Sequence, residues 1–286
     1  MESVVVVIAM GEMGAGIAAR LSKRGANVRT SLKGRGPQSA ARAKAAGVTA
    51  IDDERALLDG ADFVLSILPP GEARNLARRL LPALQANARK PVYVDCNAIA
   101  PNTVRDVAAI LAPTGGKFVD GGIIGAPPKG DDVGPRLYLS GDDAKQAAGL
   151  ARYGLDMRVI AGGIGAASAL KLSYASLTKG MVALGSESIL SAERAGVGAA
   201  LKAELAASQP QLLAMLQKRV PDMVPKAYRW VAEMEEIAAY FAGLPSQGAG
   251  YEGAARLYEK LAAGVPERGK PGSPISLLES FLGKSG

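Results

Sequence analysis

The sequence contains no histidine and only one cysteine, Cys96. Without histidine, the chain lacks the commonest general base and the commonest metal ligand of proteins, so proton transfer must use Lys, Tyr, Asp, Glu or Cys. No spacing typical of a metal site occurs, and we predict none. A single cysteine cannot form an internal disulfide, which favours a reducing compartment, and we expect a cytoplasmic protein.

Aromatic residues are also scarce, at 5% of 286 residues. The formal charge is +7, but the Lys and Arg residues are scattered among Asp and Glu instead of forming a basic stripe. We therefore predict no nucleic-acid partner, and an anionic cofactor or substrate accounts for the positive balance. The apolar stretch Val4–Ile8 is too short to cross a bilayer and follows no basic leader, so we expect neither a membrane span nor a signal peptide.

The first half of the chain alternates short β-branched runs with helical Ala/Arg/Leu patterns, which is typical of βαβ units and a parallel sheet. The predicted strands are Val4 to Ala9, Asn27 to Ser31, Asp62 to Leu68, Pro91 to Asp95, Lys117 to Val119, Arg136 to Leu139 and Met157 to Ile160. The predicted helices between them are Gly14 to Arg24, Pro37 to Ala46, Gly71 to Leu84 and Pro101 to Leu111.

The strand patterns stop after Gly162-Gly163, and helical spacing takes over. Ala166 to Ala195 predicts one long, mostly buried helix, and further helices follow. The predicted fold class is therefore α/β. It comprises a Rossmann-type, doubly wound NAD(P)-binding domain over residues 1–161, then an all-α substrate and dimerisation domain over residues 162–286.

A glycine-rich turn follows the first predicted strand. Gly11 lets backbone approach a pyrophosphate, Gly14 lets the helix pack closely on the strand, and the helix N-terminus attracts negative charge. The first glycine of the usual pattern is replaced by Ala9. The position of this turn, inside a βαβ unit, predicts dinucleotide binding. The residues expected to touch the cofactor here are Met10, Gly11, Glu12, Met13 and Gly14.

The end of the second predicted strand indicates which nicotinamide cofactor is used. An NAD-selective site carries Asp or Glu there, but this chain has Ser31, Lys33 and Arg35. Ser31 can hydrogen-bond a 2′-phosphate, and the two cations can neutralise it. We therefore expect NADP, with NAD as the less favoured cofactor; a solvated basic loop is the alternative.

Several motifs together resemble the 3-hydroxyacid dehydrogenase and 6-phosphogluconate dehydrogenase group, in its less-characterised phosphogluconate-dehydrogenase-like branch. The motifs are Gly11-Glu12-Met13-Gly14, Leu68-Pro69-Pro70, Asp95 to Pro101, Phe118 to Ala126 and Lys171-Leu172-Ser173-Tyr174, which cover about the first two-thirds of the chain. The resemblance implies that Leu68, Pro69, Pro70 and Asn97 line the cofactor, that Gly122, Ile123 and Ile124 hold substrate, and that substrate sits between the two domains.

Lys171 is the candidate for proton transfer. On an apolar helix, partial burial would lower its pKa toward neutrality, but the residues alone favour a lysine whose stem covers apolar surface while its ammonium reaches water. The resemblance implies the catalytic role of general acid and base.

The chain also departs from the family pattern. The usual Ser-Gly-Gly substrate loop aligns with Ile124-Gly125-Ala126, and Ala175 replaces an asparagine four residues after the lysine. Tyr174 shares the face of Lys171 and is the candidate to supply the missing hydrogen bond; core packing is the alternative. Lys179, two helical turns on, is a candidate to bind a substrate anion; a solvated lysine is the alternative.

The sequence thus predicts an NADP-dependent enzyme that transfers hydride between the nicotinamide and a small 3-hydroxy acid or related carbonyl. An imine reductase, a decarboxylating sugar-acid dehydrogenase and a non-catalytic NADP-binding sensor are the alternatives. Lys171 favours alcohol chemistry because imine reductases commonly carry another residue there. A long apolar helix in such a protein commonly packs on its twin, so we predict a homodimer.

Overall fold

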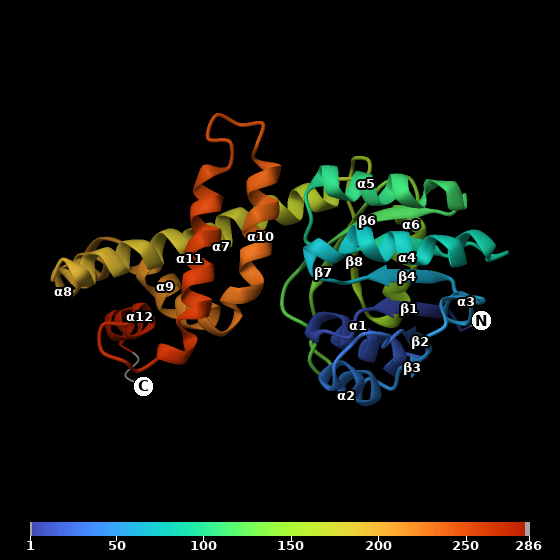
Figure 1. Ribbon diagram of the computed structural model, residues 1–286, viewed down its shortest axis with the longest axis horizontal. Coiled ribbons are helices and arrows are strands. Elements are labelled where there is room, and N and C mark those ends of the chain that lie inside the picture. Colours follow the sequence, from blue (N-terminus) through green and yellow to red (C-terminus); the bar gives the residue numbers. More distant parts are fainter. Residues whose placement is uncertain (1, 284–286) are drawn as a thin grey trace. The chain divides into compact units, whose positions relative to one another are not determined.

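The computed structural model describes residues 2–283, and its contacts divide the chain into two compact units, Met1–Leu172 and Ser173–Gly286 (Figure 1). The division falls inside the long helix α7 (Ala166–Arg194), whereas the sequence patterns change before that helix begins. The sequence predicted this helix almost to its ends. No helix among the described residues is long and apolar enough to cross a lipid bilayer.

The first unit is built on one eight-stranded sheet with the order β3-β2-β1-β4-β5-β6-β7-β8. The strands are β1 Val4–Ile8, β2 Asn27–Thr30, β3 Thr49–Ala50, β4 Phe63–Ser66, β5 Val92–Asp95, β6 Phe118–Ile124, β7 Arg136–Ser140 and β8 Asp156–Val159. All neighbouring strands run parallel except β6 and β7. This order, with the first strand central, is that of the Rossmann fold, and the predicted fold class is confirmed.

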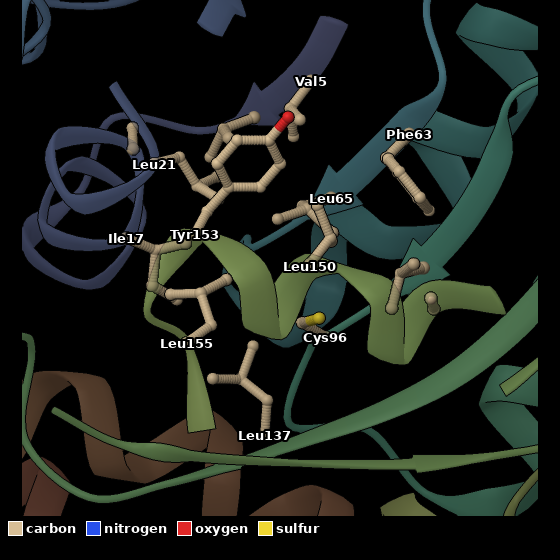
Figure 2. Close-up of a cluster of buried hydrophobic side chains, with 14 of the residues drawn as sticks. Val5, Ile17, Leu21, Phe63, Leu65, Cys96, Leu137, Leu150, Tyr153 and Leu155 are labelled. Atoms are coloured by element: carbon tan, nitrogen blue, oxygen red, sulfur yellow. The ribbon is translucent and has the colours of Figure 1, made fainter. Parts of the chain in front are cut away.

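Helices cover both faces of this sheet. They are α1 Glu12–Lys23, α2 Pro37–Ala45, α3 Glu54–Leu58, α4 Ala73–Ala86, α5 Pro101–Leu111 and α6 Ala144–Ala147. Alternate residues of β1 point to opposite faces, so Val5 and Val7 join the core under α1 and α6, whereas Val6 and Ile8 join the core under α4 and α5. Figure 2 shows the first of these cores, to which α1 contributes Ile17 and Leu21 and the sheet contributes Val5 and Leu65.

Three of these strands and α-helices were not predicted. The strand β3 has two residues, both exposed, while α3 has five and α6 has four. None is long enough to establish a hydrophobic period in the sequence. The antiparallel pairing of β6 and β7 also departs from the expected parallel sheet. It follows from a short connection, because a parallel partner would need a helical crossover of a dozen or more residues.

Among the described residues of the second unit, every regular element is a helix. Besides the larger part of α7, it has α8 Gly198–Ser208, α9 Pro210–Met223, α10 Ala227–Tyr240, α11 Ala249–Ala263 and α12 Pro274–Leu282. Trp230 of α10 and Tyr258 of α11 meet edge to face at 5.3 Å between ring centres, which ties these two helices together.

Candidate functional site

The turn from β1 into α1 has the shape of a phosphate-binding turn. Gly11 is the residue before the helix and makes no side-chain cap, and a Cβ added to it would meet no atom within 4 Å. A Cβ on Gly14 would lie 1.9 Å from the carbonyl oxygen of Ala9. One glycine therefore leaves space open above the first turn, and the other lets helix and strand touch. Glu12 is exposed beside this turn, Met13 is half-buried, and Met10 is buried.

The surroundings of the end of β2 include a carboxylate that the sequence did not predict there. Lys33 and Arg35 are exposed, while Ser31 is buried. The carboxylate of Asp52, which follows β3, accepts hydrogen bonds from the backbone N–H of Leu32 at 3.0 Å and from the Ser31 hydroxyl at 3.4 Å. A carboxylate is therefore present at this strand end, although it is contributed by a later segment of the chain.

The Lys33 ammonium also has a carboxylate neighbour, Glu54 of α3, at 3.9 Å. Asp53, between Asp52 and Glu54, caps α3 by accepting from the N–H of Ala56. Sequence reasoning missed Asp52 and Glu54 because only the pairing of the two-residue strand β3 with β2 brings them here.

Asn97 fastens two of the predicted cofactor loops together. Its side-chain oxygen accepts from the backbone N–H of Leu68 at 2.6 Å, and its side-chain N–H donates to the Ser66 hydroxyl at 2.9 Å. Leu68 is buried, Pro69 is exposed and Pro70 is half-buried. The loops after β4 and β5 are thus held side by side at the carboxyl edge of the parallel sheet, where ligands of open α/β folds bind.

These strand ends suit a dinucleotide. An uncapped helix start behind an open glycine fits a pyrophosphate. A metal centre has no comparable support, because no group of three or more His, Cys, Asp and Glu residues gathers within residues 2–283.

Lys171 lies in the first unit and packs on β6. A Cβ added to Gly122 would come within 3.1 Å of the Lys171 Cβ and 2.7 Å of the Ala167 carbonyl oxygen, so only a glycine lets α7 approach the strand this closely. Lys171 is half-buried, and Ile123 and Ile124, next along β6, are each 7% exposed. The contact brings the predicted acid–base residue against the predicted substrate strand.

The loop between β6 and β7 crosses over α1. A Cβ on Gly16 would lie 2.9 Å from Pro128. Asp132 pairs with Arg20 at 2.8 Å, and Asp131 pairs with Lys23 at 2.7 Å. The chain that continues from the predicted substrate strand is therefore fastened to the helix of the glycine turn.

Tyr174 and Lys179 belong to the second unit. The Tyr174 side chain is exposed. Lys179 forms an ion pair with Glu233, and its ammonium lies 4.7 Å from the centre of the Trp230 ring. Its backbone oxygen accepts from the Tyr258 hydroxyl at 2.6 Å. The Lys179 side chain thus has an internal anion as a partner.

Two buried residues, Asp95 and Cys96, lie at the end of β5. Burial raises the pKa of the Asp95 carboxyl to about 7; the backbone N–H of Asn97 opposes this rise, and the nearby Asp120 carboxylate adds to it. Burial likewise raises the pKa of the Cys96 thiol, so this cysteine is not a reactive thiolate.

Comparison with known proteins agrees with this architecture. Residues 4–148 match the family model of the NAD binding domain of 6-phosphogluconate dehydrogenase, and residues 192–261 match a domain of unknown function. A 3-hydroxyisobutyrate dehydrogenase of Pseudomonas aeruginosa is 33% identical over 125 residues, which are 42% of this chain and 41% of that protein. The chain spans about half the length of the curated relatives that it matches.

Solved structures extend the likeness to nearly the whole chain. A conserved protein of unknown function, described as structurally similar to 3-hydroxyacid dehydrogenases, is 32% identical with a TM-score of 0.68, over 92% of this chain and 97% of that one. A Mycobacterium tuberculosis 3-hydroxyisobutyrate dehydrogenase with L-serine has a TM-score of 0.69 at 21% identity, over 98% and 99%. An imine reductase variant from Myxococcus stipitatus with NAD+ has a TM-score of 0.58 at 17% identity, over 99% and 100%. The last two likenesses concern the fold. The family-model match and the first structure are more specific, and the chain belongs to the 3-hydroxyacid dehydrogenase and 6-phosphogluconate dehydrogenase-like family.

Proposed function

We propose that this protein is an NADP(H)-dependent oxidoreductase that acts on a small 3-hydroxy acid or a related carbonyl compound, with Lys171 as general acid and base. The observation that carries the proposal is the contact between Lys171 and Gly122 on β6. The open glycine turn after β1 ends at the same carboxyl edge of the sheet, because β1, β4, β5 and β6 run parallel.

The cofactor, when bound, gives or accepts the hydride. The Lys171 amine holds or moves the proton at the substrate oxygen, a task that no histidine in this chain can take. Gly11, Gly14 and the first turn of α1 hold the pyrophosphate, and Leu68 to Pro70 with Asn97 line the nicotinamide side. Gly122 to Ile124, Tyr174 and Lys179 bind substrate; for Lys179 this requires a substrate anion to compete with Glu233.

NADP preference rests on Lys33 and Arg35, which offer two exposed cations after β2. Asp52 opposes a 2′-phosphate by its charge, but its carboxylate is engaged by the Leu32 N–H and the Ser31 hydroxyl. The single cysteine supports a reducing compartment, the cytoplasm.

A homodimer is the assembly that we propose, with α7 at its interface. Leu177, Met181 and Leu184 recur at four- and three-residue spacing and are 66%, 47% and 67% exposed. They form one apolar stripe, and Met181 and Leu184 border a groove of about 280 Å³ against α8 and α9. A stripe of this kind is typical of a helix that packs on another helix.

The assembly is tested by light scattering. Leu177→Glu is expected to give the monomer mass, and Tyr228→Glu, at an exposed apolar residue of α10, is expected to leave the dimer mass unchanged. A monomer mass for the unaltered protein would contradict the proposal.

The activity is tested by NADPH and NADH oxidation across a panel of small 3-oxo acids, aldehydes and cyclic imines, with the reverse reaction on 3-hydroxy acids and a sugar acid. We expect turnover on a 3-oxo acid or aldehyde and a higher kcat/KM with NADPH. Equal or better use of NADH would contradict NADP preference. Turnover on imines alone, or decarboxylation of the sugar acid alone, would replace the substrate class. Nucleotide binding without any turnover would indicate a sensor.

A further inference from the structure

The backbone N–H groups at the start of α7 are hydrogen-bonded by residues of the sheet. This feature is separate from the strand ends described above. The Asp120 carboxylate of β6 accepts hydrogen bonds from the backbone N–H of Gly165 at 2.9 Å and of Ser168 at 3.1 Å. It also accepts from the Ser168 hydroxyl at 2.6 Å. A helix normally leaves its first N–H groups without partners inside the helix, and here a carboxylate from another element takes two of them.

Ser140 of β7 completes this arrangement. Its hydroxyl donates to the Asp120 carboxylate at 3.0 Å and accepts from the backbone N–H of Ala167 at 3.0 Å. Asp120, Ser140 and Ser168 are 0%, 0% and 1% exposed. Four donors therefore converge on one buried carboxylate, which is the condition under which a buried charge is retained.

The geometry connects this anchor to the proposed chemistry. Ser168 lies one helical turn before Lys171, and Asp120 lies two residues before Gly122 on the strand that Lys171 touches. Helix and strand are thus joined at two neighbouring levels: by the carboxylate at Asp120 and by the close approach at Gly122. A helix fixed at its first turn cannot slide or rotate without breaking these hydrogen bonds.

We infer that Asp120, with Ser168 as its main side-chain partner, is a positioning residue that sets the place of the Lys171 amine over β6. This role rests on the proposed function, in which Lys171 moves a proton.

The experiment compares Asp120→Asn and Ser168→Ala, each alone and combined with Lys171→Met. The asparagine keeps the size of the side chain but presents an amide N–H toward N–H and O–H donors. We expect at least a tenfold loss of kcat for Asp120→Asn and a loss of about threefold for Ser168→Ala, with the NADPH dissociation constant unchanged. In the Lys171→Met background both changes should have no further effect on kcat, because groups that act through one another are not additive.

Two control variants separate positioning from general destabilisation. Asp62→Asn alters a carboxylate that accepts from the Val4 N–H at the opposite edge of the sheet. Ser176→Ala removes a buried α7 hydroxyl that donates to the Ser173 carbonyl at 2.8 Å. Both are expected to keep the native kcat at a temperature where every variant is folded.

A second readout does not depend on turnover. The rate at which an amine-reactive reagent labels Lys171, measured by peptide mass spectrometry, should change at least threefold in Ser168→Ala and Asp120→Asn, while the labelling of Lys145 stays the same. If Asp120→Asn does not fold, Ser168→Ala carries both readouts.

The outcomes distinguish this inference from the proposed function. Native turnover in Lys171→Met would remove the proposed function. Loss of turnover in Lys171→Met, together with native kcat and native Lys171 labelling in both anchor variants, would remove only the positioning role. An equal loss of kcat from Asp120→Asn with and without Lys171 would also overturn it.

Discussion

Two long helices start against the same sheet, and their first turns are completed in opposite ways. The first turn of α1 has no side-chain cap, and the space beyond Gly11 is open. The first turn of α7 is filled by the Asp120 carboxylate and the Ser140 hydroxyl. An open start offers its N–H groups to an external anion, whereas a start closed by an internal anion holds the helix itself in place. One helix start is thus suited to binding the cofactor, and the other to fixing the residue that acts beside it.

The largest expected loss of stability comes from filling the close contact between α1 and the end of β1. In Gly14→Ala the new Cβ would lie 1.9 Å from the Ala9 carbonyl oxygen, so helix and strand must move apart. We expect unfolding free energy to fall by at least about 3 kcal/mol, at the upper end of the usual cost of overpacking. Urea unfolding followed by circular dichroism measures this loss, and a midpoint equal to that of the unaltered protein would show that the two elements are not in close contact.

A second buried carboxyl, that of Asp95, lies in the same sheet and contrasts with Asp120 in its hydrogen bonding. Asp95 is paired in register with Asp120 on the neighbouring strand, but its Oδ2 has no hydrogen-bond partner among the described residues. Because burial raises the pKa of Asp95 from 3.8 to about 7, the folded protein binds this proton more tightly than the unfolded chain. Its stabilising contribution is complete below pH 3.8 and is lost as the pH rises through 7.

Asp95→Asn should therefore stabilise the protein at pH 8 by up to about 4 kcal/mol and flatten the decline of stability between pH 5 and 8 by about 3 kcal/mol. The asparagine oxygen can still accept from the Asn97 N–H. Unfolding titrations at several pH values measure the difference. A variant that is less stable than the native chain at pH 8 would be inconsistent with a desolvated carboxylate.

Gly11→Ala separates binding from folding at the open helix start. The new methyl group meets no protein atom within 4 Å, so stability should stay unchanged. The methyl does enter the space proposed for the pyrophosphate, and NADPH affinity should fall about tenfold, or about 1.4 kcal/mol. Isothermal titration calorimetry measures the NADPH dissociation constants of the variant and of the unaltered protein. Unchanged affinity would move the pyrophosphate elsewhere.

The smallest effect is expected at the exposed loop after β2. Lys33→Ala and Arg35→Ala should each weaken NADPH binding by about fivefold and leave NADH binding unchanged, since exposed ionic contacts contribute up to about 1 kcal/mol. Lys145→Ala, at an exposed cation of α6, serves as the matched control. Equal losses for both cofactors would place the two cations away from the 2′-phosphate.

Much of this arrangement could be predicted from the sequence because it is local. The glycine turn, the buried strand before it and the long helix are each contained within a continuous stretch, and hydrophobic period and turn residues identify them. The Lys171 helix was predicted for the same reason.

The remainder depends on pairing between distant segments. Asp52 reaches the end of β2 only through β3, which has two residues, both exposed. Asp120 caps a helix that begins far along the chain, and in the sequence it is only a carboxylate that follows the predicted strand Lys117 to Val119. The partner of Lys179, Glu233, comes from another helix. Local patterns contain no information about such contacts, because side-chain partners across elements are set by tertiary packing.

The central claim is that the Lys171 amine moves the proton, and Lys171→Met tests it most directly. The methionine keeps an unbranched apolar stem beside Gly122 and removes only the amine. With the substrate identified by the carbonyl panel, we predict a fall in kcat of ~10²–10⁴ with an unchanged NADPH dissociation constant. Native kcat in this variant would contradict the account.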